Sequence, residues 1–479
     1  MSERSPRRLG NKVVRKRLNA RTVIELDHDD GHKNRSTIND HAKLFVAAVV
    51  VIFLLGSALL MLPIATESDH RTSFIDALFT SISAFSVTGL TTVETQQHWS
   101  FFGEAVILVL IQIGGFGFMA GTSLVLVALG RRTSLAANKM MQDGSPAMTL
   151  REASHFSLRI VKFMAISEAI GAVILTVFFM RTESLLTSIW WGIFHSVSAF
   201  CNAGIDLQGH ELSLQGQAES PVFLMTIAGL VQLGALSYMV LNDIWKHRAW
   251  KPLTLDSKLV IITNFTLIAV ASVLFLAVEW NTSLTDVDSV WKPANAAFEG
   301  IASRTSGFSS INWGEAHNSS MYLWIAIMMI GGAAGSTTGG IKLATIAIVA
   351  MTVMSTVKGR DDSQAFGRRI APQLVFRALS IIALFLVVHF VLSLMLVMTE
   401  DILNDDSFSF LALMFEAMSA LATVGLSTGI TADLSMGGKI VLMIAMFIGR
   451  LGPITVAFAL QNRQQHDRFR YAEANIRIG

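Results

Sequence analysis

Long apolar runs constrain this chain more than any other feature of its sequence. A helix needs roughly 20 residues to cross the hydrocarbon core of a bilayer, and eight regions supply an apolar run of about that length. With 52% apolar and only 15% charged residues, the chain has the composition of a protein that folds in lipid. The runs cover 44–64, 105–129, 163–180, 221–242, 259–278, 321–357, 378–399 and 440–460.

Lys and Arg are distributed very unevenly over the segments outside these runs. Alternate segments hold 29 of them, namely 1–42, 131–162, 243–258, 358–377 and 461–479. The remaining connections hold five, namely 65–104, 181–220, 279–320 and 400–439. Short loops rich in Lys and Arg stay in the cytoplasm, so we expect eight spans with both termini cytoplasmic. Residues 1–42 are expected to form a basic cytoplasmic tail, because they contain no apolar core of a secretory signal.

Each of the four connections poor in Lys and Arg contains a moderately apolar stretch too short to span. Such a stretch is typical of a re-entrant helix, and non-helical backbone at membrane depth must line a water-filled cavity or be buried in protein. The sequence therefore predicts an all-α integral membrane fold with four helix, pore loop, helix repeats around a central pore. The re-entrant helices are expected at 73–86, 185–201, 291–304 and 407–422. The repeats are expected at 43–132, 156–247, 257–358 and 373–462, followed by a cytoplasmic tail at 463–479.

A similar short phrase ends each re-entrant stretch. The four phrases are SISAFSVTGLT at 81–91, HSVSAFCNAGID at 195–206, EGIASRTSGFSS at 299–310 and EAMSALATVGLS at 416–427. Their glycines, Gly89, Gly204, Gly307 and Gly425, are separated by 115, 103 and 118 residues. One such phrase would indicate only a glycine turn after a short helix, whereas four in register indicate an internal repeat.

The phrases have the chemistry of a cation filter. A dehydrated potassium ion needs oxygen atoms around it, and backbone carbonyls supply them when successive peptides point inward, which glycine makes possible. Only Thr423, Val424 and Gly425 come close to the potassium-channel sequence, so the predicted filter is not four-fold symmetric. The predicted filter residues are Val87, Thr88, Gly89, Asn202, Ala203, Gly204, Thr305, Ser306, Gly307, Thr423, Val424 and Gly425.

The run at 321–357 contains the phrase GGAAGSTTGG at 331–340. Each glycine costs a helix roughly 1 kcal/mol relative to alanine, so this segment is expected to be non-helical and to lie under the filter, lining the cavity. A small-residue packing patch is the alternative. Packing is the preferred explanation for the glycines at 114, 115, 117 and 121 in the second run.

Over residues 43–462 the sequence resembles the Trk, Ktr and plant HKT superfamily of cation transporters, and more closely the membrane subunit of bacterial Ktr systems. The phrase GRLGPIT at 449–455 and the lack of an extra helix pair before the first repeat favour Ktr over Trk. The resemblance implies potassium uptake across the bacterial cytoplasmic membrane, with Gly89 favouring potassium over sodium. A sodium-selective or mixed member of the superfamily remains the alternative, as does sodium acting as an activator or coupling ion.

The resemblance also implies a gate and partners. It makes 331–340 a flexible intramembrane loop that obstructs the pore below the filter, a homodimer with one pore per protomer, and a cytoplasmic ring of RCK-type nucleotide-binding subunits. The chain itself offers no cytoplasmic segment long enough for a nucleotide-binding domain. The gate residues are Gly331, Gly332, Gly335, Ser336, Thr337, Thr338, Gly339, Gly340, Lys342 and Arg450.

Two cations lie within the predicted spans, where a charge is costly. Arg450 is expected to face the pore, oppose cations and hold the loop, although an ion pair with Glu168 would also explain it. Lys342 either takes part in gating or extends to the cytoplasmic surface.

Other polar residues near the phrases have ordinary explanations. Glu299 and Glu416 are expected to hold pore helix and loop together rather than to touch the ion. Asp206 either attracts cations at the outer mouth or is a solvated acid. His195 and Cys201 are expected to be structural. Paired catalytic carboxylates and metal-ligand spacings are absent from the sequence, which argues against an intramembrane enzyme.

Overall fold

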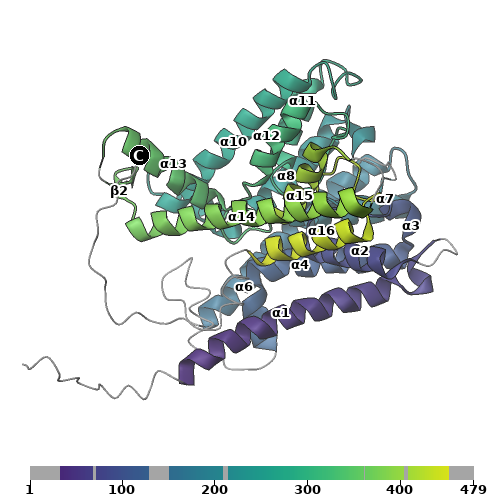
Figure 1. The fold of residues 1–479 in the computed structure, drawn as a ribbon, viewed down its shortest axis with the longest axis horizontal. Coiled ribbons are helices and arrows are strands. Elements are labelled where there is room, and N and C mark those ends of the chain that lie inside the picture. The colour runs from purple at the N-terminus through teal and green to yellow at the C-terminus, as the bar shows by residue number, and fades with distance from the viewer. Residues whose placement is uncertain are drawn as a thin grey trace, which may run out of the picture.

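The computed structural model describes residues 33–67, 72–128, 150–208, 214–360, 362–403 and 408–452. Most of these residues are helical (Figure 1). The helices of the apolar runs, called the long helices below, are α1 (Lys33–Leu60), α4 (Phe101–Ala128), α6 (Leu150–Phe179), α8 (Pro221–Ala235), α10 (Leu255–Glu279), α12 (Asn318–Met328), α13 (Leu343–Val357), α14 (Pro372–Leu403) and α16 (Met436–Leu451). The helices of the four expected re-entrant stretches, called the short helices below, lie between them and are α2 (Phe74–Ser86), α7 (Leu185–Cys201), α11 (Lys292–Ala302) and α15 (Phe410–Leu421).

The four short helices begin where the sequence supplies helix-starting residues. The hydroxyl of Ser73 accepts a hydrogen bond from the amide of Asp76, and Ser184 accepts one from the amide of Thr187. A proline in the first turn starts α11 in place of a side-chain cap. The helices lie within the ranges expected for re-entrant segments, although α11 ends two residues before Arg304.

Packing between consecutive units closes a ring. Helices α1 and α4 pack on α2, α6 and α8 on α7, and α14 and α16 on α15. In addition, the second long helix of each unit packs on the short helix of the next, in the pairs α4 with α7, α8 with α11, α12 with α15, and α16 with α2. Because the last pair returns to the first unit, the four units surround a common centre.

The run expected to form one span at 221–242 is not a single straight helix. Helix α8 ends at Ala235, and α9 (Tyr238–His247) leaves at an angle of 94° to it. Ser237, at the break, has a φ of +62°. The carbonyls freed at the end of α8 are satisfied from a distant part of the chain, because Ala235 O accepts from the amide of Ala333 at 2.8 Å and Gly234 O from that of Thr337 at 3.3 Å.

The glycine-rich run between α12 and α13 is non-helical, as its composition predicts. Its two ends are held together by hydrogen bonds, from Gly331 N to Ile341 O and from Ile341 N to Met329 O, both 2.9 Å long. A Cβ atom on Gly331 would collide with Gly339 O, so the close approach of the two ends requires glycine. The run is therefore a closed loop inserted between two half-length helices.

Three helical stretches of the described residues are long and apolar enough by themselves to cross a membrane, namely Ser157–Phe179, Leu255–Glu279 and Pro372–Asp401, and the bent pair α8 and α9 would make a fourth. The full count of eight spans stays a prediction. A hairpin of two-residue strands, β1 (Gln364–Ala365) and β2 (Arg368–Arg369), was not anticipated. Most of the expected tails, at 1–32 and 463–479, lies outside the described residues.

Candidate functional site

The four glycine phrases have the same backbone pattern. In each loop the glycine has a positive φ, which is +97° at Gly89, +68° at Gly204, +75° at Gly307 and +93° at Gly425. The residue two positions earlier also has a positive φ, and these residues are Val87, Asn202, Thr305 and Thr423. The residue between them does not, so the backbone alternates in hand. Alternation turns successive carbonyl oxygens toward the same side of the loop, which is the geometry of a cation filter.

The loops meet in cyclic order. A Cβ atom on Gly204 would lie 2.6 Å from Ser306 O, and one on Gly307 would lie 3.0 Å from Val424 O. A Cβ atom on Gly89 would collide with Ala203 O, and one on Gly425 would collide with Thr88 O. Each glycine thus faces the carbonyl that precedes the glycine of the next loop, and the fourth loop faces the first.

Side chains hold these loops to their pore helices. Ser83 and Ser419, each six residues before its glycine, accept hydrogen bonds from Gly89 N at 3.1 Å and Gly425 N at 3.0 Å. Ser198, at the matching place in the second loop, donates to Ile205 O at 2.7 Å. The third loop has Ile301 at this place.

The 331–340 loop touches the C-terminal ends of two of these helices, α7 and α15. Asn202 Nδ2 donates to Thr337 Oγ1 at 2.7 Å, and Thr337 Oγ1 donates to Phe200 O at 3.4 Å. A Cβ atom on Gly339 would lie 2.8 Å from Ala422 O and would collide with Thr423 Oγ1. The loop therefore lies directly against the predicted filter residues Asn202 and Thr423 of the second and fourth units.

Internal bonds keep this loop compact. Thr338 Oγ1 accepts from Gly332 N at 2.9 Å and bonds the Ser336 hydroxyl at 2.6 Å. Two further glycines, Gly335 and Gly340, have positive φ values of +75° and +62°. Nothing lies within 4 Å of the space that a side chain on Gly335 would occupy, so the tip of the loop has room to move.

Arg450, buried in α16, connects this loop to the first unit. Its Nη1 donates to Thr337 O at 2.6 Å, and its Nη2 donates to the carbonyl of Gly114 in α4. Glu168, the alternative partner, accepts from Gln112 Nε2 at 3.2 Å. The contacts agree with the expectation that Arg450 holds the loop.

Lys342 does not reach for the membrane surface. Its Nζ donates to Thr338 O at 2.6 Å, which places the ammonium group back against the loop. Both cations named from the sequence thus bond carbonyls of 337 and 338, at the tip of the loop.

The two buried glutamates hold loop backbone, as expected. Glu299 Oε1 accepts from the amide of Ser310 at 2.7 Å, and Glu416 Oε1 accepts from that of Thr428 at 2.8 Å. His195 is fully buried and bonds Trp191 O at 2.7 Å, which fits a structural role. Asp206 accepts from the amide of Gln208 at 3.0 Å.

The sequence analysis did not single out Arg304, which is 2% exposed. It occupies the position held by Ser86, Cys201 and Ala422 in the other loops. Its Nη1 donates to Asn264 Oδ1 at 2.8 Å, and Asn264 Nδ2 donates to Gln232 Oε1 at 3.0 Å. The available signal was that this is the one Arg or Lys in the four phrases.

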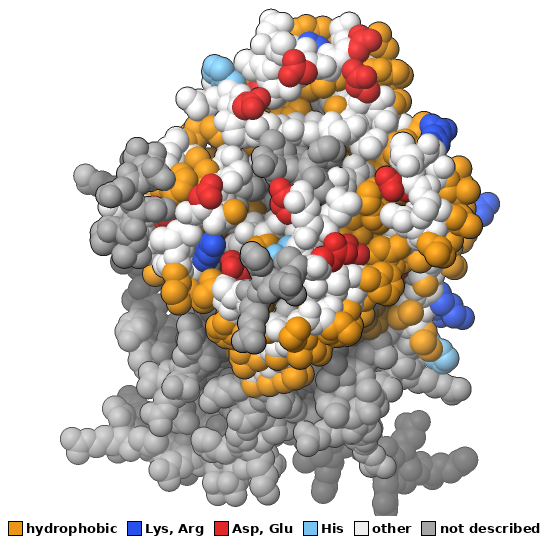
Figure 2. Space-filling model, turned by 90° about the vertical axis from the view of Figure 1, so that its right-hand side faces the viewer, with side chains coloured by type: hydrophobic (Ala, Val, Ile, Leu, Met, Phe, Trp, Pro, Cys, Tyr) orange, Lys and Arg blue, Asp and Glu red, His pale blue; other side chains and the backbone are white. Residues whose placement is uncertain are grey.

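Acidic side chains gather at the mouth of the site. Figure 2 looks onto the end of the molecule where the connections poor in Lys and Arg lie, and red acidic side chains are scattered over its middle. Exposed acids of these connections include Glu183, Glu219, Asp288 and Glu315. Acidic side chains at this end would attract cations toward the loops.

Comparison with known proteins agrees with this geometry. The TrkH family model, described as a cation transport protein, matches residues 22–469. The potassium/sodium uptake protein NtpJ of Enterococcus hirae is 36% identical over 445 residues, covering 91% of this chain and 97% of the relative. The Ktr system potassium uptake protein B of Bacillus subtilis is 32% identical over 431 residues, covering 89% and 94%.

The fold has a solved counterpart. The crystal structure of the potassium transporter TrkH from Vibrio parahaemolyticus matches with a TM-score of 0.66 and 19% identity, over 88% of this chain and 85% of that one. The chain therefore belongs to the TrkH family of cation transport proteins and is a membrane-embedded cation uptake transporter of the Trk and Ktr type.

Proposed function

We propose that this chain takes up potassium through a filter made by the four glycine loops. The observation that carries the proposal is the cyclic contact of Gly89, Gly204, Gly307 and Gly425 with the carbonyls of the neighbouring loops. Carbonyls of the residues at and before each glycine replace the water shell of the ion, and the resulting rings set its preference for potassium. The four repeats, 43–132, 156–247, 257–358 and 373–462, supply eight spans and four pore helices around this axis.

The loop at 331–340 gates this path. It bears on Asn202 and Thr423 at the inner end of the filter, and Arg450 and Lys342 add positive charge beside it. A cation leaving the filter meets both an obstruction and an electrostatic barrier. Opening requires the loop to release Thr337 from Asn202 and Arg450.

Regulation comes from outside the chain. Two similar proteins, from Bacillus subtilis and Vibrio alginolyticus, are named Ktr system potassium uptake protein B. We infer that a homodimer of this chain binds a cytoplasmic ring of RCK-type nucleotide-binding subunits. The chain lies in the bacterial cytoplasmic membrane, with both termini on the side rich in Lys and Arg.

The second candidate is transport or activation by sodium, because the Enterococcus hirae relative is named as a potassium/sodium uptake protein. Isotope uptake into a potassium-starved bacterium that lacks its own potassium transporters separates the two. We expect saturable potassium uptake that excess sodium does not inhibit competitively. Faster uptake of sodium than of potassium would reverse the assignment, and stimulation of potassium uptake by low sodium would identify sodium as an activator.

A further inference from the structure

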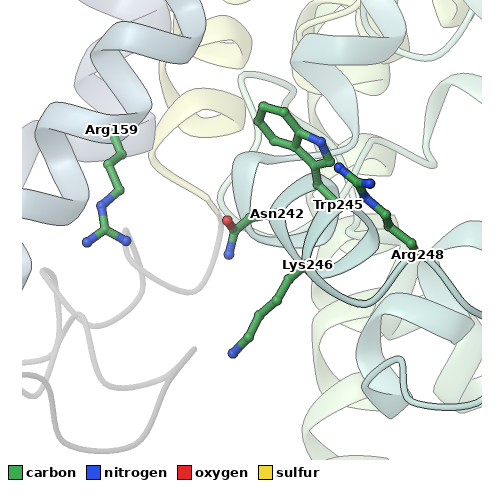
Figure 3. A pocket seen from close by; sticks show the side chains of 5 residues that line it. All are labelled: Arg159, Asn242, Trp245, Lys246 and Arg248. Atoms are coloured by element: carbon green, nitrogen blue, oxygen red, sulfur yellow. The ribbon is translucent and has the colours of Figure 1, made fainter.

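A basic pocket lies at the end of the molecule opposite the acidic mouth. It has a volume of about 470 Å³ and is lined by Arg159 of α6 and by Asn242, Trp245, Lys246 and Arg248 of and next to α9 (Figure 3). All five side chains are exposed, and three of them are cations. A volume in this range is typical of small-molecule sites, which hold roughly 300–1,000 Å³.

The 94° bend between α8 and α9 determines how this pocket faces the membrane. Helix α8 packs within the ring of long helices, and α9, nearly perpendicular to it, has the orientation of a helix that lies along a membrane surface. Arg159 lies in the first turn of the apolar stretch Ser157–Phe179, at the same level as α9. The rings of Phe163 in α6 and Tyr238 in α9, with centroids 5.8 Å apart, hold the two helices beside each other.

Apolar side chains border the cations. Met239 is 39% exposed, Ile244 36% and Trp245 74%, while Val240 packs into the protein. An exposed tryptophan beside Lys and Arg on a surface helix is typical of the membrane interface, where its ring lies among the headgroups. A water-soluble acidic partner would satisfy the cations but would leave no reason for the apolar border.

The acid on α9 is directed elsewhere. Asp243 Oδ2 accepts from the amide and the hydroxyl of Thr254, at 3.0 and 2.9 Å, and Oδ1 bonds His247 Nδ1 at 2.8 Å. None of the residues that line the pocket is acidic. Within the part of the chain that the structure describes, the pocket therefore presents three cations and no acidic side chain.

We propose that this pocket binds the headgroup of an anionic phospholipid. Arg159, Lys246 and Arg248 contact the phosphate, Asn242 hydrogen-bonds the glycerol or phosphate oxygens, and Trp245, Met239 and Ile244 contact the upper acyl chain. The bound lipid contacts both α6 and α9. Directly before α9 in the chain, the end of α8 holds the 331–340 loop through Gly234 and Ala235.

Native mass spectrometry of the delipidated, detergent-purified full chain tests this site. Phosphatidylglycerol and phosphatidylcholine with the same acyl chains are titrated separately. We expect one tight phosphatidylglycerol per chain, with affinity roughly tenfold or more above that for phosphatidylcholine, because each interfacial cation adds to the attraction for an anionic lipid. Equal affinity for the two lipids would overturn the proposal.

A charge-matched pair of variants locates the binding. Arg159→Gln, Lys246→Gln and Arg248→Asn combined should weaken phosphatidylglycerol binding roughly 10- to 100-fold. Asparagine is used at 248 because this residue has a φ of +48°, which asparagine tolerates. The control neutralises three exposed cations elsewhere, Lys358, Arg360 and Arg368, and should bind as wild type. An equal loss in both variants would show nonspecific attraction and overturn the site.

Two further measurements separate the possible ligands. Inorganic phosphate at millimolar concentration should not displace the lipid. Trp245→Ala should weaken binding of the diacyl lipid and leave binding of a soluble glycerophosphoglycerol headgroup unchanged. Full displacement by phosphate would make the pocket a free-phosphate site. Binding of the cytoplasmic subunit that is lost in the pocket variant, with lipid binding unchanged, would make it a protein interface instead.

Discussion

The third repeat differs from the other three in its second long helix and at the end of its pore helix. In the first, second and fourth, a glycine of the second long helix lies against the carbonyl near the end of the pore helix. These pairs are Gly114 with Phe85, Gly234 with Phe200 and Gly449 with Leu421, and a Cβ atom at any of the glycines would collide with the carbonyl. In the third, the second long helix is interrupted between Met328 and Leu343, and the buried Arg304 lies two residues beyond the end of the pore helix.

The difference separates three closely packed second helices from one that a loop interrupts. In the first, second and fourth repeats, the glycine lets the second helix approach the pore helix closely. The third has instead a loop that, besides its internal hydrogen bonds, bonds Asn202, Gly234, Ala235 and Arg450 of other repeats. Such bonds can be broken singly, which supports the proposal that this loop is the gate.

The largest expected effect comes from releasing that loop. Deleting 335–337 shortens the loop that obstructs the path, and Arg450→Ala removes a unit charge from a poorly screened site beside it. Each change should raise potassium flux roughly 10- to 100-fold in liposomes without the cytoplasmic partner. Arg368→Ala removes a charge from the exposed hairpin and should leave flux unchanged. Misfolding can lower flux but does not raise it. Unchanged flux in both properly folded variants would return 331–340 to a packing role.

Filter glycines should show the next largest effect. In Gly425→Ser the new side chain would collide with Thr88 O at a φ of +93°, so we expect potassium uptake to need roughly tenfold more external potassium. Gly89→Ser should raise sodium uptake relative to potassium. Gly429→Ser is the control, since it has a similar φ of +91° but nothing within 4 Å. Equal kinetics in all three variants would contradict the filter assignment.

Variants of Arg304 and Asn264 test the comparison through the stability of the fold. Asn264→Leu removes the acceptor of a buried guanidinium and should destabilise the fold by about 2–3 kcal/mol. Adding Arg304→Met should recover part of this loss, because removal of both partners leaves no unpaired buried charge. Thermal unfolding in detergent measures the effect. A double variant less stable than Asn264→Leu would mean that the arginine has stabilising contacts beyond Asn264.

The serines six residues before the glycines give the smallest effect. Ser419→Ala leaves Gly425 N without its acceptor and should cost about 1–3 kcal/mol, seen as lower thermal stability and weaker potassium affinity. Ser303→Ala in the third pore helix should change stability by less than about 1 kcal/mol, since that hydroxyl bonds Gly300 O of its own helix at 3.5 Å. Comparable losses would show that the third loop is held as the others are.

Local composition determined much of what could be predicted. The pore helices at 74–86 and 185–201 were predicted to within one residue of their ends. Each follows a capping serine and is followed by a residue of positive φ. The five glycines among the ten residues of 331–340 disfavour a helix there. Family membership also followed from the sequence. The assignments of individual filter and gate residues stay predictions.

Contacts between distant segments decided the rest. The break at Ser237 is invisible in an apolar run, because the unpaired carbonyls of α8 are satisfied by residues about 100 positions later. Packing distinguished Gly114, which touches Phe85, from Gly117, which has nothing within 4 Å of its Cβ position. The sequence alone determined which segments cannot be helical. Only the tertiary structure decided which buried polar groups pair, because that depends on where four separate repeats meet.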